Sequence, residues 1–272
     1  MRVRKLLFLT FLVGFVGLLA SCSKYRKIEK NEDWRVKYEA ALNYYDDKDY
    51  YHSALLFEQI RPIVRGLPEG EKVEFLLAYC QYNERTYLLA SAQFRTFYET
   101  YGRSAQAEEA HFMYAYSLYA ASPDFNLDQT SGIEAMGAMQ TFLNQYPNSE
   151  FAEKATNVIL ESQLKLERKS YVNAKLYLKL RRYKASIIAF DSFKEDFPDS
   201  KFNEEMAFLK VEAQFKLASQ SLPGLQEERY HTVIEYYTQL VDSYPNSTFL
   251  KDAEKYYVES LTKVNNTTTD NS

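Results

Sequence analysis

One apolar pattern recurs five times in this chain, and it restricts the fold to an array of helical repeats. Counted from Tyr183, the small residue Ser186 falls at position 3. Aromatic residues follow at positions 7, 10 and 14, which are Phe190, Phe193 and Phe197. Such spacings place side chains on one face of an α-helix. The same frame begins again at Tyr50, Tyr87, Gly132 and Tyr230.

A second helical stretch precedes each stripe, so the repeating unit is a helix pair. Nine positions before the aromatic residue that opens three of the stripes, the chain has Ala41, Ala78 and Ala174. This layout resembles the tetratricopeptide repeat, a helix-turn-helix unit of about 34 residues with small residues where the two helices touch. Gln81 is an exception, since it stands where the repeat favours a bulky packing residue. We therefore predict an all-α solenoid of about five tetratricopeptide-like repeats.

The predicted domain boundaries follow from this frame. Segments 121–130 and 219–228 contain turn-forming residues and predict extended loops inside two repeats. Segment 152–180 has neither Pro nor Gly and predicts a long helix. The predicted parts are a signal peptide at 1–21, a lipidated tether at 22–33, five repeats within 34–263 (about 34–66, 71–104, 106–149, 152–200 and 203–247, plus a closing helix at 249–263), and a disordered tail at 264–272.

The first 22 residues have the composition of an export signal. Three of the first five residues are basic, 6–19 is apolar, and Leu-Ala-Ser-Cys at 19–22 is a small-residue cleavage site. This end resembles the bacterial lipobox, in which the cysteine receives a thioether-linked lipid and becomes the first residue. We therefore expect Cys22 to carry a lipid anchor and the polar segment after it to act as a tether. The alternative is an ordinary secretory signal whose cysteine is incidental.

Charge and motifs argue against several classes of function. A net charge of -4 without a basic stripe disfavours nucleic-acid binding, which depends on lysine and arginine. The sequence has no Gly-rich phosphate loop, HExxH, paired CxxC or GxSxG motif, and His52, His111 and His231 lie in different repeats. We therefore predict no catalytic residues, no metal site and no cofactor other than the lipid. Cys80 lies in an apolar helical run and is expected to be a small buried residue.

Aromatic residues make up 16% of the chain and need an explanation. In the tetratricopeptide frame, the first helix of each pair lines the concave surface of the solenoid, where side chains are not needed for the core. Aromatic residues there are predicted to bind peptide. The alternative is that they pack on adjacent helices, because tyrosine serves both roles. The predicted groove residues are Arg35, Tyr38, Tyr45, Phe75, Tyr79, Tyr82, Phe112 and Tyr116.

The lipobox, the helix pairs and the repeat ends together resemble the BamD family, lipoprotein subunits of the β-barrel assembly machinery of Gram-negative outer membranes. The resemblance runs from Cys22 to about Lys263. It is most specific at 128–130, in the stripe and repeat end at 142–149, at 151, 152 and 155, and in a charged helix through 165–169. It implies a lipid-anchored, non-catalytic scaffold on the periplasmic face of the outer membrane. It also implies that the C-terminal repeats dock on a BamA-type barrel protein, while the N-terminal repeats receive unfolded outer-membrane proteins.

Two other interpretations stay open at this point. One is a tetratricopeptide adaptor lipoprotein of the cell envelope. The other is a glycan- or nutrient-binding surface lipoprotein, although the single Trp34 offers little for sugar stacking.

The lipobox generates a direct prediction. Cys22→Ala removes the sulfur that would carry the lipid, so the protein should move from the membrane fraction to the soluble periplasm. Fractionation of envelopes from cells expressing each form measures this. A variant that stays in the membrane fraction unchanged would show that lipid on Cys22 is not the anchor.

Overall fold

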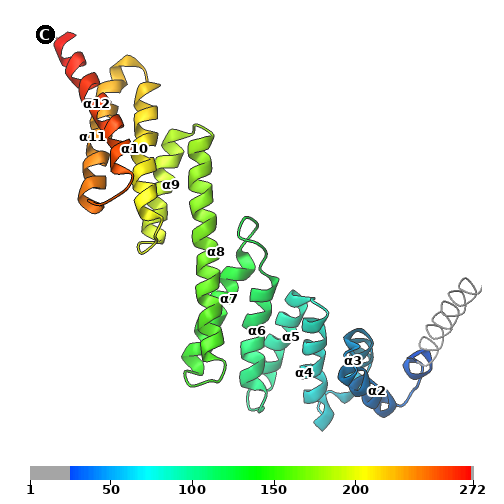
Figure 1. Ribbon diagram of the computed structural model, residues 1–272. Coiled ribbons are helices and arrows are strands. Elements are labelled where there is room, and N and C mark those ends of the chain that lie inside the picture. The colour runs from blue at the N-terminus through cyan, green and yellow to red at the C-terminus, as the bar shows by residue number, and fades with distance from the viewer. Residues whose placement is uncertain (1–24, 271–272) are drawn as a thin grey trace, which may run out of the picture. The chain divides into compact units, whose positions relative to one another are not determined.

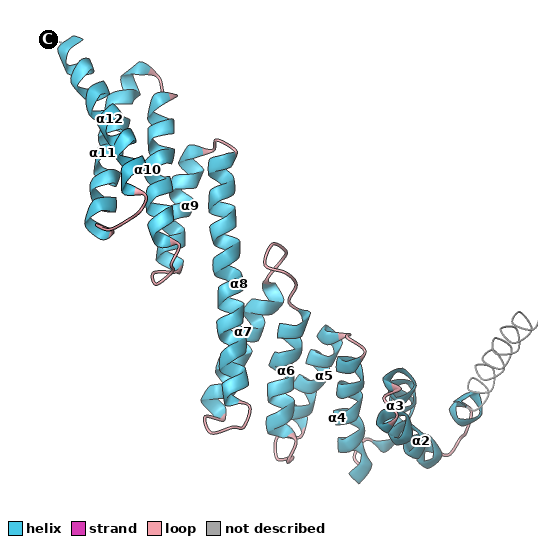
Figure 2. Cartoon of the chain, viewed as in Figure 1, coloured by secondary structure: helices cyan, strands magenta, loops and turns pink. Residues whose placement is uncertain are grey.

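The computed structural model describes residues 25–270, and it describes side chains through residue 266. The predicted signal peptide and the predicted lipidation site Cys22 lie outside the described residues. Residues 25–270 form helices joined by short loops, with no strand among them, which confirms the all-α prediction (Figure 2). No helix in this part of the chain is long and apolar enough to cross a membrane.

The chain divides into two compact units, and the boundary at residue 162 falls within α8. Unit 1 ends at this boundary and excludes 124–126, which belong to unit 2. In each unit, helices that follow one another in the sequence pack side by side (Figure 1). The helices of unit 1 are α2 (Trp34–Asp46), α3 (Tyr50–Val64), α4 (Pro68–Asn83), α5 (Tyr87–Thr100), α6 (Ala107–Ala121) and α7 (Thr130–Gln145), followed by the start of α8 (Ala152–Lys179).

Unit 2 begins with the second half of α8 and continues the alternation of paired helices. The 28 residues of α8 confirm the long helix predicted from the absence of Pro and Gly. The other helices of unit 2 are α9 (Tyr183–Asp196), α10 (Asn203–Ser219), α11 (Pro223–Ser243) and α12 (Leu250–Asp270).

The repeated stripe forms the core of both units. Phe57, Phe94 and Phe190 occupy position 7 of the stripe, Phe142 occupies position 10, and each is at most 2% exposed. The small residues predicted at the helix crossings are buried as well, which confirms that part of the repeat frame. At the first crossing the Ser53 hydroxyl donates a hydrogen bond to the carbonyl of Ala41 at 2.9 Å. The buried small pairs are Ala41 and Ser53, Ala78 and Ala90, and Ala174 and Ser186.

Two sequence predictions are wrong in detail. Segment 219–228 is not an extended loop, because α11 starts at Pro223 and continues unbroken through the stripe. Proline fits the first turn of a helix, where its missing N–H would have no partner, so the Pro–Gly pair starts the helix instead of preventing it. The closing helix is also longer than predicted, since α12 continues to Asp270 across most of the segment expected to be disordered.

The predicted tether is partly packed against the first helix pair. Residues 25–29 are helical, and Tyr25 is only 8% exposed. Its ring lies 4.4 Å from the ring of His52 and 6.1 Å from that of Tyr44, measured between centroids. The polar composition of this segment did not predict the contact, because among residues 25–33 only Tyr25 and Ile28 pack against the core. Residues 25–29 are therefore not part of a free tether.

Three turns within helix pairs share one geometry with an unusual residue at its centre. Lys48, Arg85 and Arg181 have φ values of 61°, 61° and 58°, in the left-handed region that normally favours glycine. In each turn two backbone bonds close the preceding helix in a Schellman motif; at the second turn they are Arg85 N–H to Tyr82 C=O and Thr86 N–H to Gln81 C=O, both 3.0 Å. The Thr86 hydroxyl also donates to the Gln81 side chain at 2.7 Å, which explains how a polar residue is tolerated at this buried position.

This strain predicts a stabilising substitution. Arg85→Gly should raise the free energy of unfolding by about 1 kcal/mol, because glycine adopts positive φ without the steric cost of a Cβ atom. Chemical denaturation of the two forms measures the change. The neighbouring Glu84, with φ of -74°, supplies the control. Glu84→Gly should lower stability by about 0.5–1 kcal/mol, and equal effects of the two substitutions would contradict the argument.

Candidate functional site: two partner-binding surfaces

The structure separates the eight predicted groove residues by their exposure. Arg35 is exposed, and its guanidinium lies 4.7 Å from the centre of the Trp34 ring. Phe112 is only 1% exposed, so the expectation that groove residues are free of the core is wrong for this residue. Its ring stacks on that of Phe151 at 4.7 Å, which fills the space between α6 and the start of α8. The remaining six are half-buried: Tyr38, Tyr45, Phe75, Tyr79, Tyr82 and Tyr116.

Four half-buried tyrosines of α4 and α6 define a surface in unit 1, which we call the aromatic face: Tyr79, Tyr82, Tyr116 and Tyr119. The rings of Tyr82 and Tyr116 lie 6.1 Å apart, and those of Tyr116 and Tyr119 lie 5.8 Å apart. The Lys154 ammonium group stands 4.1 Å from the centre of the Tyr116 ring, within cation–π range. Each ring therefore packs on the core along one edge and keeps part of its surface accessible.

The hydroxyl groups of Tyr79, Tyr82 and Tyr119 stay protonated at neutral pH. Burial, followed by the field of neighbouring tyrosines, raises the pKa of Tyr82 to about 12. A hydrogen bond to Glu161, together with burial, raises the pKa of Tyr119 to about 12. The Tyr79 hydroxyl donates to Glu109, and burial and this bond raise its pKa as well. The face can thus offer neutral rings and hydroxyl groups to a ligand, which suits apolar and aromatic peptide side chains.

A second surface lies in unit 2, where the sequence analysis identified no site. A groove of about 780 Å³ runs between the second half of α8 and α9, and we call it the α8–α9 groove. Ile188 on α9 is 66% exposed and Tyr177 on α8 is 44% exposed, values that are high for large apolar side chains between two packed helices. The groove is lined by Leu166, Lys169, Ser170, Asn173, Ala174, Tyr177, Ala185, Ile188, Ala189, Ser192, Asp196 and Phe197.

The helix that forms one wall of this groove is strongly basic. Residues 163–179 of α8 contain five Lys or Arg residues and one acidic residue, Glu167, in a chain whose net charge is -4. Arg181, Arg182 and Lys184 follow in the turn and at the start of α9. Exposed apolar residues interrupt the basic ones, among them Leu164 at 62% and Leu176 at 47%. A basic amphipathic helix is typical of a partner-binding or membrane-surface segment. This run of positive charge is the sequence signal that indicates the groove. The repeat pattern does not reveal it, because that pattern concerns the buried faces of the helices and not the exposed ones.

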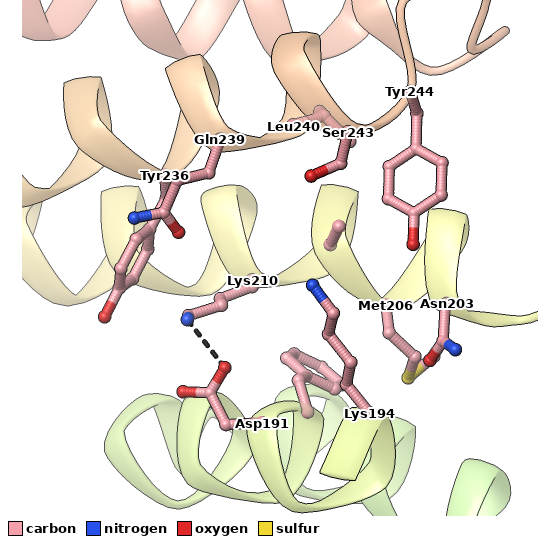
Figure 3. Close-up of a pocket in the computed structure, with 12 residues that line it drawn as sticks. Asp191, Lys194, Asn203, Met206, Lys210, Tyr236, Gln239, Leu240, Ser243 and Tyr244 are labelled. Atoms are coloured by element: carbon pink, nitrogen blue, oxygen red, sulfur yellow. Dashed lines mark hydrogen bonds and ion pairs between the residues drawn. The ribbon is translucent and has the colours of Figure 1, made fainter. Parts of the chain in front are cut away.

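A smaller cavity between α9, α10 and α11 does not offer a peptide site. Its volume is about 60 Å³, enough for water but not for a side chain with its backbone. Figure 3 shows Lys210 reaching across it to Asp191, at 2.6 Å. The same ammonium group lies 4.0 Å from the centre of the Tyr236 ring. The cavity is therefore bridged by an ion pair that joins α9 to α10.

His111 and Cys80 occupy packing positions, whereas His231 is exposed. His111 is buried, its ring stacks on Tyr98 at 4.3 Å, and burial lowers its pKa, so it is neutral at physiological pH. Cys80 is buried against the Ser53 hydroxyl at 3.5 Å, and burial raises the pKa of its thiol to about 11, which confirms the predicted structural role. The described residues contain no group of three or more His, Cys, Asp or Glu side chains arranged to hold a metal ion.

Comparison with known proteins adds independent information. Residues 30–224 match the model of the YfiO family, described as outer membrane lipoprotein. A provisionally named outer membrane protein assembly factor BamD from Aquifex aeolicus is 29% identical over 173 residues, which cover 63% of this chain and 56% of the relative. The outer membrane protein assembly factor BamD from Pasteurella multocida is 22% identical over 225 residues, covering 79% of this chain and 86% of the relative. The chain thus spans little more than half the length of the first relative and most of the second.

Proposed function

This chain belongs to the YfiO family of outer membrane lipoproteins, and on that premise we propose that it is a non-catalytic scaffold of outer-membrane β-barrel assembly. The named relatives are assembly factors, which supports a role in the same process. The proposal includes a lipid on Cys22 that anchors the chain to the outer membrane, with the repeats in the periplasm. It assigns the two surfaces to different partners.

The observation that carries the proposal is the open α8–α9 groove. In a tetratricopeptide array each helix pair packs on its neighbours, so an exposed side chain such as Ile188 marks an interface that another molecule completes. Full burial of one such side chain contributes about 1.5–3 kcal/mol. The basic residues along α8 favour a partner whose protruding apolar side chain is surrounded by acidic residues. We assign this groove to a BamA-type barrel protein.

The aromatic face is assigned to unfolded outer-membrane proteins. Its half-exposed rings provide flat apolar area, and Lys154 provides a single cation beside them. Aromatic C-terminal segments of barrel proteins combine apolar side chains with a terminal carboxylate. The apolar side chains would contact the tyrosine rings, and the carboxylate would pair with Lys154. A non-catalytic role is consistent with the neutral state of the tyrosines and with the packing roles of His111 and Cys80.

Docking in the groove is tested by affinity purification from detergent-solubilised envelopes. Wild-type protein should recover an outer-membrane barrel protein with periplasmic domains. Ile188→Glu should lose at least about tenfold of this recovery, because it places a charge where apolar contact is expected. Val258→Glu is the matched control, since Val258 is 53% exposed on α12 and lies outside the groove. Equal recovery by both variants would reject the groove as the docking site.

Depletion of the protein tests the assembly role itself. Levels of outer-membrane barrel proteins should fall, and unaltered levels would favour the adaptor interpretation instead. The result does not depend on which surface binds which partner.

Substrate binding at the aromatic face is tested with a fluorescent peptide that ends in an aromatic barrel-protein segment. Tyr116→Ala should weaken its binding by about tenfold, the equivalent of one aromatic contact of about 1.4 kcal/mol. Tyr51→Ala removes a 58% exposed ring in the same unit but outside the face, and should bind as wild type does. Thermal melts of both variants check that binding is measured on folded protein. An unchanged affinity in Tyr116→Ala would exclude the aromatic face.

A further inference from the structure

The turn between α8 and α9 borders a third pocket in unit 2, distinct from the α8–α9 groove and from the cavity between α9, α10 and α11. Its volume is about 290 Å³, and it opens between the end of α8 and the last turns of α10. Four cationic side chains line it: Lys175 and Lys179 from α8, Arg181 from the turn, and Lys216 from α10. We call this site the turn pocket. Half of the eight lining residues are Lys or Arg, whereas the whole chain has 33 Lys and Arg among 272 residues.

The positive charge of the turn pocket is only partly neutralised. Lys175 pairs with Glu205 at 2.7 Å, and Lys216 pairs with Glu212. The C-termini of α8 and α10 add about -0.5 elementary charge each. These groups offset three of the four cations. Lys179 and Arg181 are exposed and make no ion pair among the described residues.

Two more cations are chain neighbours of the lining residues Arg181 and Tyr183. Arg182 and Lys184 follow directly in the chain, are exposed, and also lie outside the ion pairs of the described residues. The local excess is therefore about three positive charges, because these two add to the one left inside. An anion with two or more oxygen atoms, such as a phosphate diester, could contact Lys179 and Arg181 at once.

Exposed leucines flank the same pocket. Leu180 in the α8–α9 turn is 58% exposed, and Leu222 in the α10–α11 turn is 75% exposed. The side-chain amide of Gln220 donates to the Tyr183 hydroxyl at 3.3 Å, so the two turns lie side by side. Cations beside protruding leucines match the interface of a bilayer, where phosphate groups lie next to acyl chains.

We propose that the turn pocket binds the phosphate of an anionic phospholipid while Leu180 and Leu222 enter the bilayer interface. The ligand is assigned to a lipid because two separate leucines protrude beside the cations, whereas a free anion would need no apolar neighbours. An acidic protein segment is disfavoured for the same reason, since protruding single leucines offer it no groove. This contact is additional to the docking role, because it uses the end of unit 2 and not the wall of the groove.

Vesicle co-sedimentation tests the proposal on the full mature chain carrying Cys22→Ala, so that no lipid anchor contributes. The protein should bind phosphatidylcholine vesicles that contain phosphatidylglycerol, and bind pure phosphatidylcholine vesicles far more weakly. Lys179→Glu with Arg181→Glu should weaken binding by at least about thirtyfold, because each basic residue near an anionic surface contributes about fivefold. The matched control is Lys194→Glu with Lys251→Glu, an equal charge change at exposed positions outside the pocket. Equal binding of the two double variants would overturn the proposal.

Two further variants test whether a loss of binding comes from unfolding and whether the ligand is a lipid or a free anion. Arg181→Gly relieves positive φ, so it should melt higher than the parent yet bind vesicles more weakly. Leu180→Ser with Leu222→Ser should also lose vesicle binding by about tenfold or more. If the leucine variant binds vesicles normally and inorganic phosphate competes fully, the pocket takes a free anion and the lipid assignment is wrong. If no form binds vesicles but Lys179→Glu with Arg181→Glu loses an envelope protein in affinity purification, the partner is protein and the proposal fails.

The docking proposal can fail separately. Ile188→Glu lies outside the turn pocket and should bind vesicles as the parent does. Loss of vesicle binding in this variant would contradict the assignment of two distinct surfaces.

Discussion

Three helix pairs share a close crossing between two small residues, and the packing around each crossing follows from it. Ala41, Ala78 and Ala174 are buried on the first helices, and Ser53, Ala90 and Ser186 are buried opposite them. Any larger side chain at these points would separate the helices and open gaps around the phenylalanine stripe. Because the crossing is tight, the large aromatic residues at the neighbouring positions fill the space between pairs, which explains why Phe57, Phe94 and Phe190 are almost fully buried.

The sequence predicted those parts of the fold that depend on side-chain period and size. The stripes, the small residues and the length of α8 all follow from local spacing, and the structure agrees with them. The failures concern long-range contact. Phe112 satisfies the groove pattern as well as Tyr116 does, but only the three-dimensional position of Phe151 decides that it is covered. Tyr25 likewise looks like part of a polar tether until the ring of His52 is placed beside it.

The α8–α9 groove shows why a site can be absent from a repeat-based prediction. A repeat frame identifies residues that every copy shares, whereas this groove arises where α8 departs from the others, with 28 residues against 13 to 16 in α2, α4 and α6. Within unit 2, α8 and α9 form the first pair, so no earlier pair of that unit covers their outer face. Ile188 is consequently exposed although the buried stripe on the same helix is intact. Irregular length, more than the shared pattern, thus creates the surface available to a partner.

The three left-handed turns share one backbone geometry but differ in the charges around them, so the two effects can be compared. Lys48, Arg85 and Arg181 have nearly the same φ, so the steric cost of a side chain is similar in all three. Their electrostatic surroundings differ. Lys48 stands between Asp47 and Asp49, and Arg85 follows Glu84, so each has an acidic neighbour in the chain. Arg181 stands near Lys179 and beside Arg182, where the charges add. One cation per turn is enough to interact with a helix C-terminus, so the third turn carries more positive charge than that role needs. The proposed anion contact rests on this excess charge.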